Sequence, residues 1–363
     1  MAELADIFRL HGPAYLDKFY KKLLPSHKRV MWDVIACRTE ALDGHVYRCP
    51  QCLQDRYVYH SCKNRHCPKC QNDQADLWLA KKQALLLPVN YYMATFTLPA
   101  ELRPWVRSHQ KDLYNLLFRA SSETLQKLAK DPRFIGGTLG MLGVLQTWKR
   151  DLGYHPHIHY IIPGGGLAPD GTWRPSKYDC LIPETVVACI FRAKIRDGFK
   201  ALDLYDHVPN TVWKKSWVVD IESVGSGKEA LKYLTPYIFR VAISNNNILN
   251  VTDKDVTFRY RDRKQPGYQA KILPAEQFIR RFLQHVLPKG FQKVRTYGLY
   301  HPKQRQKLEL VKEQLAPQDI SAATKKTSQP LVTTKPIARF YCPCCKVKML
   351  KIGKIPTQRG QPP

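Results

Sequence analysis

Apolar residues recur along the chain at two spacings, and together these spacings predict a protein of mixed helices and strands. Positions three or four apart predict amphipathic helices, whereas short runs rich in β-branched and aromatic residues predict strands. The central elements predicted in this way are strand 91–97, helix 101–129, strands 138–148 and 157–162, helix 184–202 and strand 216–222. The order β-α-β-β-α-β is that of the ferredoxin-like fold, an α+β arrangement with helices on one face of an antiparallel sheet.

Smaller elements are predicted on both sides of this central unit. Residues 5–35 predict two helices, the second of which has Pro13 in its first turn. Residues 73–87 predict another helix. After the central unit, residues 256–263 predict a basic strand, and residues 274–286 predict a helix with a proline in its first turn. The sheet is therefore expected between a helical N-terminal region and a basic C-terminal extension.

The charge balance points to a polyanionic partner. The chain has 58 lysines and arginines against 30 acidic residues, a formal net charge of +28. Nucleic acid is the commonest polyanion that such a surface attracts. There is no apolar run of about 18 residues, the length needed to span a bilayer, and the first ten residues already carry acidic groups. We therefore expect a cytoplasmic, nucleic-acid-binding protein without a membrane span.

Eleven cysteines include two Cys-x-x-Cys pairs close together, Cys49 with Cys52 and Cys67 with Cys70. The residues between the pairs leave room for a short hairpin, so four thiolates can surround one Zn²⁺. We predict a closed structural zinc site, with a redox-active dithiol as the alternative. Further residues of the same stretch fit either a second zinc site or ordinary packing: Cys37, His45, His60, Cys62 and His66.

Basic and aromatic residues are interleaved in two segments, which is typical of surfaces that bind nucleic acid. Arg65 and Lys69 lie on the cysteine-bearing loop. Lys293 and Arg295 belong to the second segment, residues 289–305, with several tyrosines between the positive charges. We predict DNA contacts from these four basic residues, and an ordinary solvated face is the alternative.

Two histidines lie on the predicted strand 157–162. Side chains of a strand alternate between its faces, so His157 and His159 point the same way, about 6.6 Å apart along the chain. Two imidazoles in this position can converge on one cation, whereas a single histidine on a strand is usually structural. The pair is therefore a candidate metal site.

A third ligand is expected from a neighbouring strand. If the hairpin turns near Leu152, Gln146 lies directly opposite His157, and opposed residues share a face of the sheet. Asp220 and Glu222, two apart on another predicted strand, are the alternative oxygen ligands. Two imidazoles with one oxygen suit Mg²⁺ or Mn²⁺ acting as a Lewis acid.

Tyr233 and Tyr237 lie four residues apart in the segment 226–240, which predicts a helix, so both hydroxyls would share one helical face. A tyrosine hydroxyl can attack a phosphate that a metal polarises and can hold the DNA end as a covalent ester. The alternative is an aromatic stripe that packs in a core. Pro236 lies between the two and would kink the helix, which changes the relative aim of the hydroxyls.

Several blocks of the sequence resemble the two-tyrosine rolling-circle transposases of bacterial insertion sequences, the IS91 family. These enzymes belong to the nucleases with a His-hydrophobic-His (HUH) motif. The blocks occur in the same order over roughly residues 5–300. They are CRTEALDGH (37–45), SCKNRHCPKCQ (61–71), FTLPAELR (96–103), GVLQTWKRDLGYHPHIHYIIPGGGL (143–167), YLTPYIFRVAISN (233–245) and FIRRFLQHVLPKGF (278–291). Pro236 stands where many relatives carry a basic residue.

The resemblance implies a zinc-bearing N-terminal segment and an HUH catalytic domain that cuts single-stranded DNA through a 5′-phosphotyrosine link. It implies that the substrates are single-stranded insertion-sequence ends and target DNA, in rolling-circle-like transposition. The roles it assigns are metal binding to His157 and His159, nucleophilic attack to Tyr233 and Tyr237, and zinc binding to Cys49, Cys52, Cys67 and Cys70.

Four domains are predicted. They are a helical, zinc- and DNA-binding domain (1–90), an HUH catalytic domain (91–265), a basic helical extension (266–313) and a linker with a cysteine-containing tail (314–363). The tail holds three cysteines without a clear fourth ligand, which makes it a weak zinc candidate. Two other functions stay open at this stage: a rolling-circle replication initiator of a plasmid or phage, and a non-catalytic zinc-containing DNA-binding protein.

Overall fold

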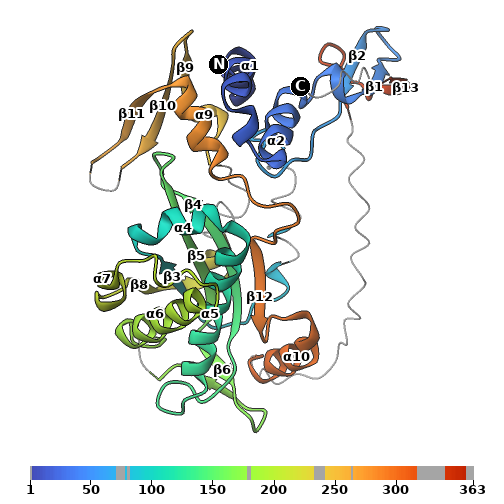
Figure 1. The fold of residues 1–363 in the computed structure, drawn as a ribbon. Helices are drawn as coiled ribbons and strands as arrows, with labels where there is room; N and C mark the ends of the chain where they lie inside the picture. Colours follow the sequence, from blue (N-terminus) through green and yellow to red (C-terminus); the bar gives the residue numbers. More distant parts are fainter. Residues whose placement is uncertain are drawn as a thin grey trace, which may run out of the picture.

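A computed structural model describes residues 2–70, 78–79, 82–177, 181–232, 242–262, 265–316 and 340–356. These parts of the chain combine helices with antiparallel sheets, as the sequence predicts (Figure 1). No helix within them is both long and apolar enough to cross a membrane.

A five-stranded antiparallel sheet lies at the centre of the fold. Its strands, in spatial order, are β12 (Val294–Gly298), β4 (Gly140–Trp148), β5 (Tyr154–Pro163), β3 (Asn90–Thr97) and β8 (Val219–Ser226). The long helices that connect them are α5 (Gln110–Ala129) and α6 (Glu184–Lys200). The order β3-α5-β4-β5-α6-β8 is the predicted one, and the neighbours β4-β5-β3-β8 are compatible with the ferredoxin-like arrangement.

Alternation along the strands gives this sheet two different faces. Ile158 and Tyr160 of β5 and Phe96 of β3 are buried in the main core together with residues of α5 and α6. The Phe96 ring lies 5.8 Å from that of Tyr160 and 4.9 Å from that of Phe191 on α6, centroid to centroid. The two helices therefore cover this face, and the alternate residues of β5, His157 and His159, point to the other.

Gly143 shows how tightly the helix-covered face is packed. It pairs with Tyr160 across the sheet, and a Cβ added to it would lie 2.5 Å from a carbon of the Tyr160 ring. That ring cannot move aside, because its hydroxyl is 2.8 Å from Ser121 Oγ and the side chain is fully buried.

We expect Gly143→Ala to destabilise the fold by about 1–3 kcal/mol, the usual cost of overpacking a core. Chemical denaturation of both proteins measures this difference. Gly353→Ala is the matched control, since a Cβ at Gly353 meets nothing within 4 Å. Equal stability of Gly143→Ala and the unaltered protein would contradict the packing described above.

The predicted helix 101–129 is interrupted. It consists of a 3₁₀ turn, η3 (Ala100–Leu102), a short α4 (Arg103–Ser108) and the long α5. The break falls at His109, whose backbone leaves the helical region at φ −118°, ψ 47°. Just before it, the Ser108 hydroxyl donates to the Trp105 carbonyl at 3.0 Å, a local bond that competes with regular helix formation.

The placement of Pro13 was wrong. It lies inside α1 (Leu4–Phe19), and the second helix, α2 (Pro25–Ala36), begins at Pro25 instead. The apolar face of α1 continues past Pro13 to the buried Tyr15, so packing outweighs the one backbone hydrogen bond that proline removes.

The N-terminal helices share a second core with residues far along the chain. Figure 1 shows the orange α9 and its hairpin beside the blue α1. These later elements are β9 (Ile248–Val251), β10 (Asp255–Arg261), β11 (Tyr268–Pro274) and α9 (Ala275–Leu283). The Phe8 ring of α1 lies 5.6 Å from the Phe282 ring of α9. Residues 266–313 are thus divided in the structure: α9 packs on α1, whereas β12 is an edge strand of the central sheet.

A third sheet joins the two ends of the described chain. Its order is β13-β1-β2, with β13 (Leu350–Ile355) antiparallel to β1 (Gly44–Arg48), which pairs with β2 (Asp55–Tyr59). The remaining elements are η1 (Tyr20–Lys22), η2 (Glu40–Leu42), β6 (Gly165–Leu167), β7 (Trp173–Pro175), α7 (Asn210–Lys214), η4 (Asn245–Asn247), η5 (Pro302–Gln304) and α10 (Arg305–Gln314). Of the predicted helix 73–87, residues 78–79 and 82–83 are helical, whereas residues 84–87 are not, so the helix ends earlier than predicted.

Candidate active site and cysteine clusters

His157 and His159 lie side by side on the open face of the central sheet. Their ring centroids are 4.8 Å apart, and each residue is 8% exposed. His157 Nδ1 is 2.6 Å from the backbone oxygen of His155, and His159 Nδ1 is 3.0 Å from Thr95 Oγ1. A neutral imidazole that donates from Nδ1 keeps its lone pair on Nε2, the form that binds metals. The His155 carbonyl can only accept, so this hydrogen bond favours the ligand form of His157, whereas the Thr95 hydroxyl can accept from His159 or donate to it.

Gln146 lies opposite His157 in the pairing of β4 with β5, which is the predicted register. The turn between the strands passes through Leu152, which has a left-handed φ of 64°. The amide nitrogen of Gln146 donates to the Trp148 carbonyl at 3.2 Å. Its amide oxygen is buried and has no hydrogen-bond partner among the described residues. A buried oxygen without a donor, on the histidine face, fits a hard divalent cation.

The carboxylates of β8 are less suitably placed than Gln146 to bind a metal together with the histidines. Asp220 shares the histidine face, because it pairs with Thr95, which in turn pairs with His159. It is exposed and lies two strands away from β5, whereas Gln146 lies on an adjacent strand. Within the described ranges, neither Asp220 nor Glu222 forms a close three-ligand group with the histidines. The structure therefore favours Gln146 over the carboxylates.

His155 is a residue of this face that the sequence analysis missed. Its ring centroid is 5.0 Å from that of His157, so three imidazoles follow one another along β5. Burial, together with the nearby His157 and the positive Arg103, lowers the pKa of His155 to about 3. His155 is therefore neutral at physiological pH. The signal was present in the sequence as a third histidine at the same alternate spacing.

Tyr233 and Tyr237 lie outside the described residues, so their predicted roles stay predictions. The chain leading to them is described: residues 227–232 are helical, and Ala230 and Leu231 are buried. They belong to a core with Val144, the residue opposite His159. The described chain therefore approaches the tyrosine segment from the histidine face of the sheet.

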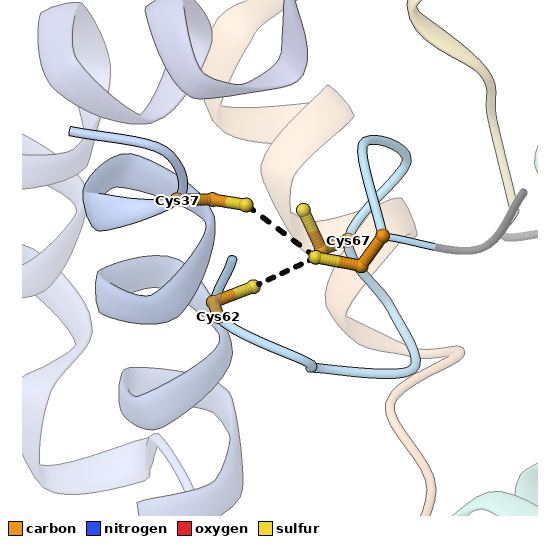
Figure 2. A group of neighbouring side chains, drawn as sticks. Cys37, Cys62 and Cys67 are labelled. Carbon is orange, nitrogen blue, oxygen red and sulfur yellow. Dashed lines mark hydrogen bonds between the residues drawn. The ribbon is translucent and has the colours of Figure 1, made fainter. Parts of the chain in front are cut away.

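Four cysteines around the end of α2 form one cluster. Figure 2 shows Cys37, at the end of α2, and Cys62 and Cys67, on the loop after β2, with their sulfurs pointing toward one another. Cys70 completes the group, and its sulfur is 3.4 Å from that of Cys37 and 3.5 Å from that of Cys62. All four sulfurs lie within 4.8 Å of one another. Four thiolates so placed fit the tetrahedral shell of Zn²⁺.

The predicted grouping of Cys49, Cys52, Cys67 and Cys70 is not the one in the structure. Cys67 and Cys70 belong to the cluster at α2, whereas Cys49 and Cys52 lie with two cysteines from the far end of the chain, Cys342 and Cys345. Each Cys-x-x-Cys pair supplies two cysteines of its cluster, and the other two cysteines come from outside that pair. Each of the two Cys-x-x-Cys pairs thus contributes to a separate cluster.

The basic residues predicted to contact DNA make bonds within the protein. The Arg65 guanidinium donates to the carbonyl of Phe291, and Lys69 forms an ion pair with Glu3. Arg295 donates to Asn115 at 2.6 Å and lies over the rings of Phe118 and Phe291. Burial, with the charge of Arg65 beside it, lowers the pKa of Lys293 to about 7. Roles in DNA contact for these four residues stay predictions.

Comparison with known proteins places the chain among transposases. The family described as "Transposase zinc-binding domain" matches residues 7–98, and the family described as "Putative transposase" matches residues 140–307. A Sinorhizobium fredii protein, "Putative transposase y4qJ", is 39% identical over 318 residues, 82% of this chain and 79% of that protein. The "Transposase for insertion sequence element IS801" of Pseudomonas savastanoi pv. phaseolicola is 25% identical over 286 residues, 73% and 68% of the two chains.

No solved structure matches the chain. The two family matches cover the α2 cysteine cluster and the histidine strand respectively, and they occur in the same order as the sites described above. The chain belongs to the IS91 family of transposases.

Proposed function

We propose that this transposase nicks single-stranded DNA at the ends of its insertion sequence by tyrosine attack and transfers the strand in a rolling-circle-like reaction. The observation that carries the proposal is the group of potential metal ligands on the open face of the central sheet. His157 and His159 hold their Nδ1 atoms in hydrogen bonds, and the buried oxygen of Gln146 lies on the adjacent strand. The names of the relatives favour transposition over replication initiation.

These three side chains would hold the catalytic cation. Mg²⁺ or Mn²⁺ bound there would act as a Lewis acid on the scissile phosphate. Two neutral imidazoles and one amide oxygen leave positions for phosphate oxygens, as a catalytic rather than a structural site requires. Packing on the helix-covered face of the sheet holds β5 in place. Its residues Ile158 and Tyr160 are fully buried there against the core that α5 and α6 help to form.

Tyr233 and Tyr237 are the proposed nucleophiles. The phenol oxygen forms a bond to phosphorus while the bond from phosphorus to the 3′-oxygen of the preceding nucleotide breaks. The phenol gives up its proton to solvent, and the departing strand gains one and leaves as a 3′-hydroxyl. The DNA 5′ end remains on the protein as a phosphotyrosine ester. A later attack by a 3′-hydroxyl reverses the step and joins the strand to a new end.

The test is an incubation with Mg²⁺ and single-stranded oligonucleotides from the flanks of the gene. We expect a protein–DNA adduct that survives denaturing electrophoresis and requires the divalent ion. The double variant Tyr233→Phe/Tyr237→Phe should form none, whereas Tyr20→Phe, a change at an exposed tyrosine of the N-terminal region, should form it normally. Full adduct formation by the double variant would overturn the assignment of the nucleophiles.

Gln146→Ala should weaken the binding of the catalytic cation. Loss of a group that supports a metal site typically lowers metal affinity or activity by about 10–100-fold. We therefore expect the Mg²⁺ concentration for half-maximal cleavage to rise by about that factor. Gln146→Glu keeps an oxygen in place and should recover most of the affinity. An unchanged Mg²⁺ dependence in Gln146→Ala would exclude Gln146 as a ligand.

A further inference from the structure

The second cysteine cluster is built from two chain segments that have the same local structure. Cys49-Pro50-Gln51-Cys52 and Cys342-Pro343-Cys344-Cys345 share the pattern Cys-Pro-x-Cys. The residue after each pair adopts a left-handed φ, 60° at Leu53 and 53° at Lys346. Neither is a glycine, so each turn holds a conformation that is costly for its side chain. The two turns therefore have the same unfavourable backbone conformation at the same position.

Backbone hydrogen bonds repeat in the two turns. The amides of Leu53 and Lys346 donate to the carbonyls of Cys49 and Cys342, both at 3.0 Å. The amide of each first cysteine is bound as well, Cys49 to the Gln54 carbonyl at 3.0 Å and Cys342 to the Val347 carbonyl at 2.8 Å. Both turns therefore form closed knuckles that project two sulfurs in the same direction.

The two knuckles face each other. The sulfurs of Cys49, Cys52, Cys342 and Cys345 all lie within 4.8 Å, and those of Cys52 and Cys342 are 3.6 Å apart. Four thiolates around Zn²⁺, each about 2.3 Å from the ion, are separated by about 3.8 Å in a tetrahedron. The cysteines are free thiols and form no disulfide. The spacing therefore suits a metal rather than a covalent bridge.

Contacts around the sulfurs hold the two segments together. Strand β13 follows the second knuckle and pairs with β1, which precedes the first (Figure 1). The rings of Tyr47 and Phe340 are 4.6 Å apart. Cys49, Cys342 and Met349 form a small buried core. Cys344, in contrast, is exposed and lies outside the cluster, with its thiol donating to the Gln54 amide oxygen at 3.2 Å.

We propose that Cys49, Cys52, Cys342 and Cys345 form a second structural zinc site that joins the C-terminal segment to the N-terminal module. Two of its ligands lie far beyond residues 7–98, the range matched by the zinc-binding family. The C-terminal cysteines, which lack a fourth ligand among themselves, obtain their partners from the N-terminal knuckle. The site is closed by four protein ligands and leaves no position for a substrate. It is independent of the chemistry at the histidines.

Zinc content of the full-length protein tests the proposal. We expect two Zn²⁺ per chain by elemental analysis after extensive dialysis. The variant Cys342→Ser/Cys345→Ser should retain one, and Cys344→Ser, the matched control in the same loop, should retain two. One zinc in the unaltered protein would overturn the proposal, and so would two in the double variant.

Alkylation of the unaltered protein gives an answer that does not depend on how a variant folds. In the zinc-loaded protein, Cys342 and Cys345 should react slowly with a thiol reagent, as should Cys49 and Cys52, whereas the exposed Cys344 and Cys189 react quickly. Removal of zinc with a chelator should make the four protected thiols reactive, which mass spectrometry of the peptides would show. Fast labelling of Cys342 and Cys345 before chelation would contradict the site.

Discussion

The double variant His157→Ala/His159→Ala is expected to lose metal-dependent DNA cleavage by a factor of about a thousand or more. A Lewis acid at a phosphate contributes several kcal/mol to transition-state stabilisation, and about 4 kcal/mol corresponds to this factor. Both imidazoles lie on the open face of the sheet, while the apolar residues between and beside them fill the main core. The variant should therefore remain folded. Cleavage rates at saturating Mg²⁺ and circular dichroism measure the two effects.

His207→Ala is the matched control, because His207 is exposed and its ring stacks on Trp105, 5.4 Å away. It should cleave at the normal rate. A folded His157→Ala/His159→Ala protein that cleaves DNA within tenfold of the normal rate would show that the pair is not the catalytic metal site.

The second large effect is expected at the cysteine cluster of α2. The variant Cys67→Ser/Cys70→Ser removes two of four thiolates, so the protein should lose one zinc and about 5 kcal/mol or more of stability. The cluster is part of the core that α1 and α2 share with α9 and β10, and its loss frees the loop from that core. Zinc analysis combined with thermal unfolding measures both changes.

Cys189→Ser is the control for this prediction, since Cys189 is exposed on α6 and belongs to neither cluster. Its zinc content and unfolding temperature should match those of the unaltered protein. Retention of full stability in Cys67→Ser/Cys70→Ser would mean that the cluster does not hold a structural metal.

The sequence predicted the central sheet and the register of its histidine strand well, because these depend on local signals. Alternation along β5 put His157 and His159 on one face, and the hairpin at Leu152 set Gln146 opposite His157. Both follow from strand geometry and a short turn. His155 follows the same alternation, so three histidines rather than two lie on this face.

Pairings between distant residues could not be predicted in this way. A Cys-x-x-Cys turn shows that two thiolates point together, but it does not show which other pair they meet. Cys52 and Cys342 are 290 positions apart, and the sequence analysis assigned them to two different domains. In the structure their sulfurs are 3.6 Å from each other. For the same reason β12 was not recognised as a strand of the central sheet: its partner β4 lies about 150 residues earlier.

The central claim, tyrosine attack beside the histidine face, is tested most directly by mapping the covalent adduct. The protein is allowed to cleave a single-stranded oligonucleotide from the insertion-sequence end and is then digested with nuclease and protease. Mass spectrometry should find a nucleotide joined through its 5′-phosphate to Tyr233 or Tyr237, and no adduct when Mg²⁺ is withheld. A nucleotide attached to any other residue, or cleavage of the oligonucleotide without a covalent intermediate, would contradict the claim.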